Sequence, residues 1–238
     1  MRRLASIAFA LALPALAALA PGCGGGGPTS LLSQGGKDYG AIRFINASPN
    51  APGLDAYLRG DEYAHDIVYA QASEYVPVKT GQPYAEFKVT GTDQTVAEAG
   101  IGIAKKGNFT LIAVNPASEM GTLFVSDDYE APAKGNARLR LLHVAPGAGT
   151  VDVYITAPGA SIAGIEPTVA DLAYLGSSGY LEAPAATYQL RICPAGTKTV
   201  AIDSGPVALA AGQVLSGLAL GDPQRGVPFS ALVLQDRI

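Results

Sequence analysis

Tryptophan is absent from this 238-residue sequence, and cysteine, methionine and histidine occur only twice each. Two cysteines, Cys23 and Cys193, cannot build the disulfide framework of a cysteine-rich secreted domain. Charged residues make up 15 % of the chain and the net charge is −4, so the chain lacks the basic balance that nucleic-acid binding requires. The 48 % of hydrophobic residues argues against disorder in the bulk of the chain.

Glycine and proline are abundant instead, with 29 and 17 residues. Glycine- and proline-rich turns separate short runs in which apolar and polar residues alternate, which is typical of half-buried strands. In residues 65–126 these runs are 65–70, 74–78, 84–89, 95–103, 109–115 and 122–126. This spacing predicts an all-β fold of immunoglobulin-like or transthyretin-like antiparallel sandwiches.

The stretch 43–57 occurs a second time at residues 140–154. Arginine, aspartate and tyrosine recur at a constant offset of 97, in the pairs Arg43 and Arg140, Asp55 and Asp152, Tyr57 and Tyr154. An internal repeat of this kind indicates two copies of one module of about 100 residues. Later matches pair Tyr75 with Tyr180 at 105 and Asp128 with Asp236 at 108. The step from 97 to 105 predicts an eight-residue insertion between Ile155 and Tyr174, as a loop with one helical turn.

The N-terminal residues have the features of an export signal. Arg2 and Arg3 precede an apolar run that is short for a membrane span and ends in small residues before Cys23. This segment resembles a bacterial lipobox, which implies an exported lipoprotein lipidated at Cys23; a plain secreted protein is the alternative. Position 24 is Gly, not the Asp of the inner-membrane retention signal of enteric bacteria, so outer-membrane sorting is expected in a diderm cell. The predicted organisation is a signal peptide at 1–22, Cys23 with a glycine-rich tether at 23–38, a first module at 39–128, a linker at 129–136 and a second module at 137–238.

The repeated pattern also resembles the domain of unknown function 4397 family. The resemblance rests on Arg43, on Asn46 or His143, on the Ala-Ser-Pro-x-Ala-Pro core at 47–52, and on the Asp and Tyr that close each copy. It covers about residues 40–238. The family comprises bacterial secreted or surface proteins with tandem β-sandwich modules, so the resemblance implies a fold and an envelope location but no activity.

Pairing of the strands on either side of residues 47–53 as a hairpin would place Arg43 opposite Tyr57, with Asp55 diagonal to Arg43. The apolar residues Ile42, Phe44, Leu54, Ala56 and Leu58 would then share the other face. An Arg–Asp–Tyr cluster of this kind could clamp a ligand carboxylate. A structural ion pair, repeated because the fold is repeated, is the favoured interpretation.

The remaining candidates are weaker. Neither His65 nor His143 has a second ligand at metal-like spacing, and no nucleophile motif is present, so the sequence predicts no metal, no cofactor and no enzyme. The favoured function is a non-catalytic envelope protein that binds another envelope protein or a glycan and contacts the membrane through its lipid. A carbohydrate-binding module and a hydrolase are the alternatives. Low-ranked ligand-contacting candidates are Asn46, Ser48, His143, Tyr63 and Tyr129, and the carbohydrate alternative requires Tyr63 and Tyr129 exposed on one face.

Overall fold

The computed structural model describes residues 38–127 and 129–237. The strands are β1 (Tyr39–Asn46), β2 (Leu54–Leu58), β3 (Asp61–Ile67), β4 (Gln71–Ala72), β5 (Val76–Lys79), β6 (Tyr84–Val89), β7 (Thr95–Gly100), β8 (Asn108–Val114), β9 (Gly121–Ser126), β10 (Asn136–His143), β11 (Val151–Thr156), β12 (Val169–Leu172), β13 (Ser177–Pro184), β14 (Ala186–Pro194), β15 (Ile202–Leu209), β16 (Val214–Asp222) and β17 (Val227–Gln235). Three 3-10 turns, η2 (Ala117–Glu119), η3 (Pro146–Ala148) and η4 (Pro223–Arg225), join some of them. Within these residues, no helix has the length and apolar character needed to cross a membrane.

The strands form four sheets, two from β1–β9, here called the N-terminal half, and two from β10–β17, the C-terminal half. The N-terminal half has sheets of order β4-β1-β8-β9, with β5 also on β1, and β3-β2-β6-β7. The C-terminal half repeats these orders as β13-β10-β16-β17 and β12-β11-β14-β15. The predicted all-β sandwich class is therefore confirmed. One feature was not predicted: the pairs β1–β8 and β10–β16 are parallel.

Each half has its own apolar core between its two sheets. The five apolar residues predicted to share a face in the first copy all lie in the N-terminal core, at less than 2 % exposure. In the C-terminal half, Leu139, Leu141, Val151 and Val153 lie in the equivalent core and Ile155 packs against it. The period-2 alternation therefore identified the core-facing side of these strands correctly.

The predicted hairpin around residues 47–53 is wrong. Strand β1 pairs with β4, β5 and β8, whereas β2 pairs with β3 and β6 in the facing sheet. Residues 47–53, with Pro49 and Pro52, carry the chain from one sheet to the other. Arg43 therefore does not lie opposite Tyr57, and the second face of β1 is covered by the C-terminal half instead of solvent.

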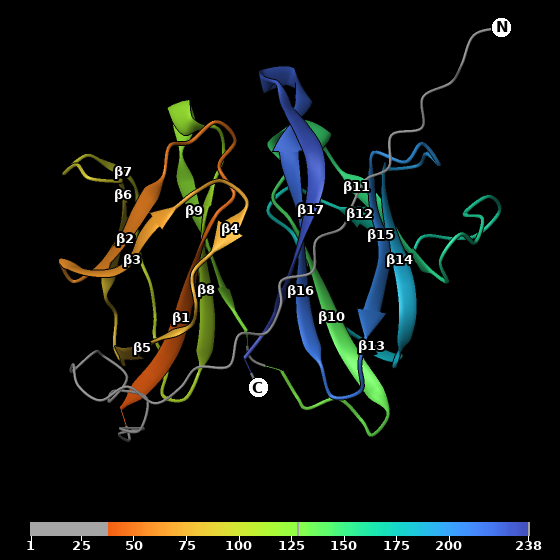
Figure 1. Cartoon of the computed structure of the whole chain (residues 1–238), viewed down its shortest axis with the longest axis horizontal. Coiled ribbons are helices and arrows are strands. Elements are labelled where there is room, and N and C mark those ends of the chain that lie inside the picture. The colour runs from red at the N-terminus through yellow and green to blue at the C-terminus, as the bar shows by residue number, and fades with distance from the viewer. Residues whose placement is uncertain (1–37, 128, 238) are drawn as a thin grey trace, which may run out of the picture. The chain divides into compact units, whose positions relative to one another are not determined.

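A third apolar core joins the two halves. It lies between the sheets that contain β1 and β10, and contains Ile45, Ala47, Ile112, Val114, Leu142, Val144, Leu218 and Leu220. Residues 38–127 and 129–237 thus form one compact unit with four stacked sheets, the two inner ones buried on both faces (Figure 1). Burial on both faces is the usual setting of parallel strand pairs, which β1–β8 and β10–β16 share.

Two details of the repeat alignment need correction. The segment between Thr156 and Val169 contains turns and bends, not a helical turn, and β12 occupies the last part of the region between Ile155 and Tyr174 that was expected to be a loop. The acid that corresponds to Asp236 is Asp127, not Asp128, because Ser126 pairs with Phe109 as Gln235 pairs with Leu215. Asp128 itself lies outside the described residues.

Candidate functional site

The repeated arginines lie between the two halves, and each binds an acid of the opposite half. Arg43 on β1 and Arg140 on β10 are 2 % and 3 % exposed. Arg43 Nη2 donates to Asp236 Oδ1 at 2.5 Å, and Arg140 Nη2 donates to Asp127 Oδ1 at 2.5 Å. Neither acid was in the predicted Arg–Asp–Tyr cluster, so the proposed pairing of Arg43 with Asp55 is wrong.

Asp127 is fully buried and accepts hydrogen bonds from three side chains. Besides Arg140, Tyr75 donates its hydroxyl to Asp127 Oδ2 at 2.8 Å and Thr110 donates at 2.6 Å. Burial, followed by the Asp127 charge, raises the pKa of Tyr75 above its usual value, so this phenol stays a donor. The guanidinium of Arg43 lies over the Tyr75 ring at 4.8 Å and donates Nε–H to Thr110 at 2.9 Å, which links the two ion pairs.

Asp236 has the matching set of partners in the C-terminal half. Tyr180 donates to Asp236 Oδ2 at 2.7 Å and Ser216 donates to the same oxygen at 2.7 Å. Arg140 lies over the Tyr180 ring at 4.7 Å and donates Nε–H to Ser216 at 3.1 Å. The network therefore repeats itself across the boundary between the halves, with Asp127, Tyr75 and Thr110 replaced by Asp236, Tyr180 and Ser216. We call these six residues, together with Arg43 and Arg140, the reciprocal network.

The repeated aspartates Asp55 and Asp152 occupy corresponding places in the outer sheets. Asp55 accepts the backbone N–H of Asp66 at 2.8 Å and of Gly91 at 3.2 Å. Asp152 accepts the N–H of Asp171 at 3.0 Å and of Gly196 at 2.8 Å. Both acids thus tie the end of a neighbouring strand and a turn to the second strand of their half. This shared geometry explains the recurrence of the aspartate by the needs of the fold.

The repeated tyrosines differ between the halves. Tyr57 donates its hydroxyl to Glu62 Oε2 at 3.0 Å, with Lys88 Nζ 4.6 Å from its ring. Tyr154 is buried, and Lys198 Nζ donates to its hydroxyl at 2.9 Å. Both rings therefore have a lysine partner, but only Tyr57 holds a carboxylate.

Asn46 and His143 make equivalent hydrogen bonds to the backbone of the loop that follows the first strand of their half. The Asn46 amide donates to Pro52 O at 3.2 Å and accepts Ser48 N–H at 3.1 Å. His143 Nε2 lies 2.6 Å from Gly149 O, and Nδ1 accepts Ala145 N–H at 3.4 Å, which requires the neutral ring protonated on Nε2. Burial lowers the pKa of His143, although its bond to Gly149 O opposes the shift.

The other low-ranked candidates lie at scattered positions. Ser48 is buried, and its hydroxyl finds no hydrogen-bond partner among the described residues. Tyr63 packs against the N-terminal core, and Tyr129 lies 5.4 Å from the Tyr180 ring with its hydroxyl on Arg237 O. Both rings are half-buried, so they do not form the exposed platform that the carbohydrate alternative requires. Cys193 is buried, as expected, whereas Cys23 lies outside the described residues.

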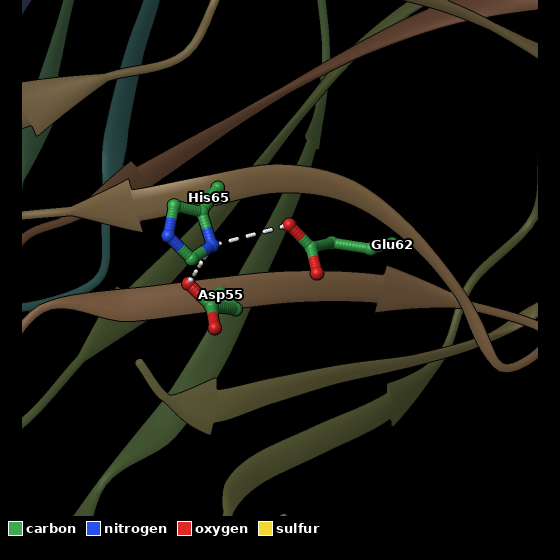
Figure 2. Close-up of side chains that lie close together, drawn as sticks. All are labelled: Asp55, Glu62 and His65. Atoms are coloured by element: carbon green, nitrogen blue, oxygen red, sulfur yellow. Dashed lines mark ion pairs between the residues drawn. The ribbon is translucent and has the colours of Figure 1, made fainter. Parts of the chain in front are cut away.

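The structure brings together one group that the sequence analysis missed. His65 Nδ1 lies 3.1 Å from Asp55 Oδ1 and 3.2 Å from Glu62 Oε1 (Figure 2). The three ligand atoms lie within 4.8 Å of one another. Glu62 and His65 are three residues apart on β3, and Asp55 comes from β2. The spacing of Glu62 and His65 was a readable signal, but the approach of Asp55 depends on strand pairing.

Comparison with protein families identifies one part of the chain. Residues 40–154 match the family model "Domain of unknown function (DUF4397)". The chain contains a DUF4397-like domain. The match begins in β1 and ends at Tyr154 in β11, so it includes both Arg43 and Arg140 and crosses from the N-terminal into the C-terminal half. The resemblance inferred from the sequence is confirmed over these residues; none of the curated proteins matches the chain significantly.

Several solved structures are similar at low identity. The Bacillus anthracis TIE protein is 10 % identical with a TM-score of 0.26, over 77 % of this chain and 34 % of that chain, so this chain spans about a third of its length. A family 26 carbohydrate-binding module of Eubacterium rectale Amy13K, solved with maltoheptaose, is 10 % identical, with a TM-score of 0.25 over 84 % and 98 % of the chains. A streptococcal virulence factor that binds alpha-glucan is 9 % identical, with a TM-score of 0.28 over 80 % and 97 %. Likenesses this distant carry no argument about a ligand.

Proposed function

We propose that this chain is an exported lipoprotein of the cell envelope, anchored through Cys23, that acts as a non-catalytic binding or scaffolding body. The basic start, the short apolar run and the small residues before Cys23 support export and lipidation. In this proposal residues 1–22 are removed, residues 23–38 are the lipidated tether, and two modules at 39–128 and 137–238 follow, joined by 129–136. Outer-membrane sorting is part of the proposal.

The reciprocal network is the observation that supports a non-catalytic role for this chain. Its two arginines and two aspartates are buried and neutralise each other across the boundary between the halves. Groups committed in this way are unavailable to a substrate. A buried ion pair adds little net stability compared with an apolar pair, but it penalises every arrangement in which one partner is left alone. We therefore assign the network to the orientation of the two halves.

The location of a binding surface follows from the same packing. Both faces of the inner sheets are covered, by a half's own core and by the core between the halves. Among the described residues, no further sheet covers the second face of the outer sheets, β3-β2-β6-β7 and β12-β11-β14-β15, although Ile162 packs on Tyr154 and Cys193 of the latter. A partner protein or glycan would therefore meet the outer sheets, where Tyr84 is 51 % exposed.

The anchor is tested in the native host by metabolic labelling with palmitate and by fractionation. Wild-type protein is expected to be labelled and to fractionate with membranes, because stable anchoring needs more than one acyl chain and a lipoprotein cysteine carries several. Cys23→Ser is expected to lose both the label and the membrane fraction. Cys193→Ser is the matched control, since it removes the buried thiol and should keep the label. If the wild-type protein is unlabelled and soluble, the lipoprotein proposal is wrong and the chain is a plain secreted protein.

A further inference from the structure

We propose that Asp55, Glu62 and His65 form a binding site for a first-row divalent cation of the Zn²⁺ type on the outer sheet of the N-terminal half. The ligand set is one imidazole nitrogen and two carboxylate oxygens, which suits such ions. The inference goes beyond the proposed function, because it assigns a ligand to a surface that the membrane anchor does not involve.

The distances from the imidazole nitrogen to the two carboxylate oxygens fit a metal ion. His65 Nδ1 lies 3.1 Å from Asp55 Oδ1 and 3.2 Å from Glu62 Oε1. Zn–N and Zn–O bonds of about 2.0–2.2 Å place neighbouring ligand atoms roughly 3–3.5 Å apart. A cation can therefore enter with little movement of these side chains, between atoms that Figure 2 joins as ion pairs.

Both carboxylates are held by groups behind them. Tyr57 donates to Glu62 Oε2, which leaves Oε1 turned toward His65. Asp55 is held by Thr90 Oγ1 at 2.9 Å as well as by the backbone of Asp66 and Gly91. These three hydrogen bonds fix the Asp55 carboxylate in place beside His65. Hydrogen-bonded carboxylates of this kind are the usual outer support of a metal site.

Comparison with the C-terminal half shows which of the three proposed ligands the fold itself requires. Asp152 has the same backbone partners as Asp55, and Asp171 has the same left-handed conformation as Asp66. The strand pairing that places Leu54 opposite Ile67 places Val151 opposite Leu172, so Ala170 stands where His65 stands. The same sequence offset matches Glu62 with Pro167, which precedes β12. The fold therefore requires the aspartate but not the histidine or the glutamate. No histidine or glutamate stands at the equivalent sequence positions of the C-terminal half.

The position of the site leaves room for further ligands. The side chains of His65 and Glu62 are 63 % and 43 % exposed, whereas that of Asp55 is 4 % exposed. A cation would therefore rest on a fixed, buried oxygen and keep open coordination positions toward solvent. Water or an oxygen ligand of a partner would fill these positions. Asp61 and Asp66 are exposed on the same β2–β3 hairpin and add negative charge that favours a cation.

The test is a titration of the purified, untagged protein with ZnCl₂, followed by calorimetry and by NMR of the histidine rings. One Zn²⁺ per chain is expected, with a change in the His65 ring signals only. His143 is the internal reference, because it is the second of two histidines in the sequence and both its nitrogens are hydrogen-bonded. His65→Gln and Glu62→Gln are each expected to weaken the affinity at least about 10-fold.

Asp61→Asn is the matched control, since it removes one negative charge from the same hairpin and no ligand. It should change the affinity less than about 2-fold, because exposed charges act weakly in salt. Asp55 is left intact, because its substitution also loosens the fold. The proposal is overturned if wild type shows no saturable binding at millimolar Zn²⁺, if His65→Gln binds as wild type does, or if Asp61→Asn weakens binding as much as Glu62→Gln.

Discussion

The two halves fill the space between their sheets with different side chains. In the N-terminal half, Phe44 meets Phe87 edge to face at a centroid distance of 6.2 Å, and Phe109 stacks on Phe124 at 5.3 Å. Strand pairing puts Leu141, Ile192, Leu215 and Val233 at the corresponding positions of the C-terminal half. Three paired positions on neighbouring strands carry Phe44, Leu111 and Phe124 in the N-terminal half. The equivalent positions of the C-terminal half carry Leu141, Gly217 and Val233.

The smaller side chains leave an apolar cavity of about 20 Å³ in the C-terminal half. Leu141, Ile192, Gly217 and Val233 are among the residues that line it. The reciprocal network, in contrast, keeps equivalent donors and acceptors in both halves, and Arg140 Nη2 adds one bond to Ser216 at 2.8 Å. Each core can be repacked by itself with hydrophobic side chains of adequate volume, whereas a change in one member of the network leaves a buried charge in the other half without its partner. The contrast indicates that the boundary between the halves is under the stricter constraint.

The largest effect is expected from Asp127→Ala and Asp236→Ala. Each change leaves an arginine of the opposite half buried without its carboxylate, together with an unpartnered tyrosine hydroxyl. Removing one partner of a buried ion pair costs about 3–5 kcal/mol. Chemical denaturation of both variants should give similar losses of unfolding free energy, because the two acids have equal roles. Asp61→Ala, at an exposed position, is the control and should stay within about 0.5 kcal/mol of wild type. A large difference between the losses of unfolding free energy in Asp127→Ala and Asp236→Ala would show that the two ion pairs are not equivalent.

The cores are compared by Phe87→Ala and Ile192→Ala. Phe87 is fully buried and packed on Phe44, so its truncation should cost about 3–5 kcal/mol. Ile192 already borders a cavity and has fewer atoms to lose, so its truncation should lie near the lower end of about 2–5 kcal/mol. Thermal and chemical unfolding measure both. An equal or larger loss at Ile192 would show that the C-terminal core is packed as tightly as the N-terminal one.

The smallest effect concerns pH. His143 is neutral in the folded protein and its pKa is lowered by burial, so below about pH 6.5 the unfolded chain takes up a proton that the folded chain does not. The contribution of His143 to wild-type stability should therefore be constant above that pH and fall below it, by at most about 1.4 kcal/mol per pH unit for one proton. His143→Asn, which copies Asn46, should lose this component, as shown by denaturation at pH 5 to 8. An unchanged pH profile in the variant would assign the effect to other groups.

Local patterns in the sequence were enough to predict the fold class and the core-facing side of the strands. Alternation at Ile42 and Phe44, or at Leu54, Ala56 and Leu58, identifies the inward side because neighbouring side chains of a strand point to opposite faces. The repeat offset likewise matched Arg43 with Arg140 and Asn46 with His143, which occupy corresponding places. These features depend on neighbours in the chain.

Partners distant in the chain were decided only by the tertiary structure. Arg43 and Asp236 are 193 residues apart, and their contact exists because β1 has a second buried face against the C-terminal half. Period-2 alternation shows that one face of a strand is polar, but it does not show whether water or another sheet covers that face. For the same reason the approach of Asp55 to Glu62 and His65 could not be read from the sequence. It depends on the register between β2 and β3, which the packing of the two strands sets.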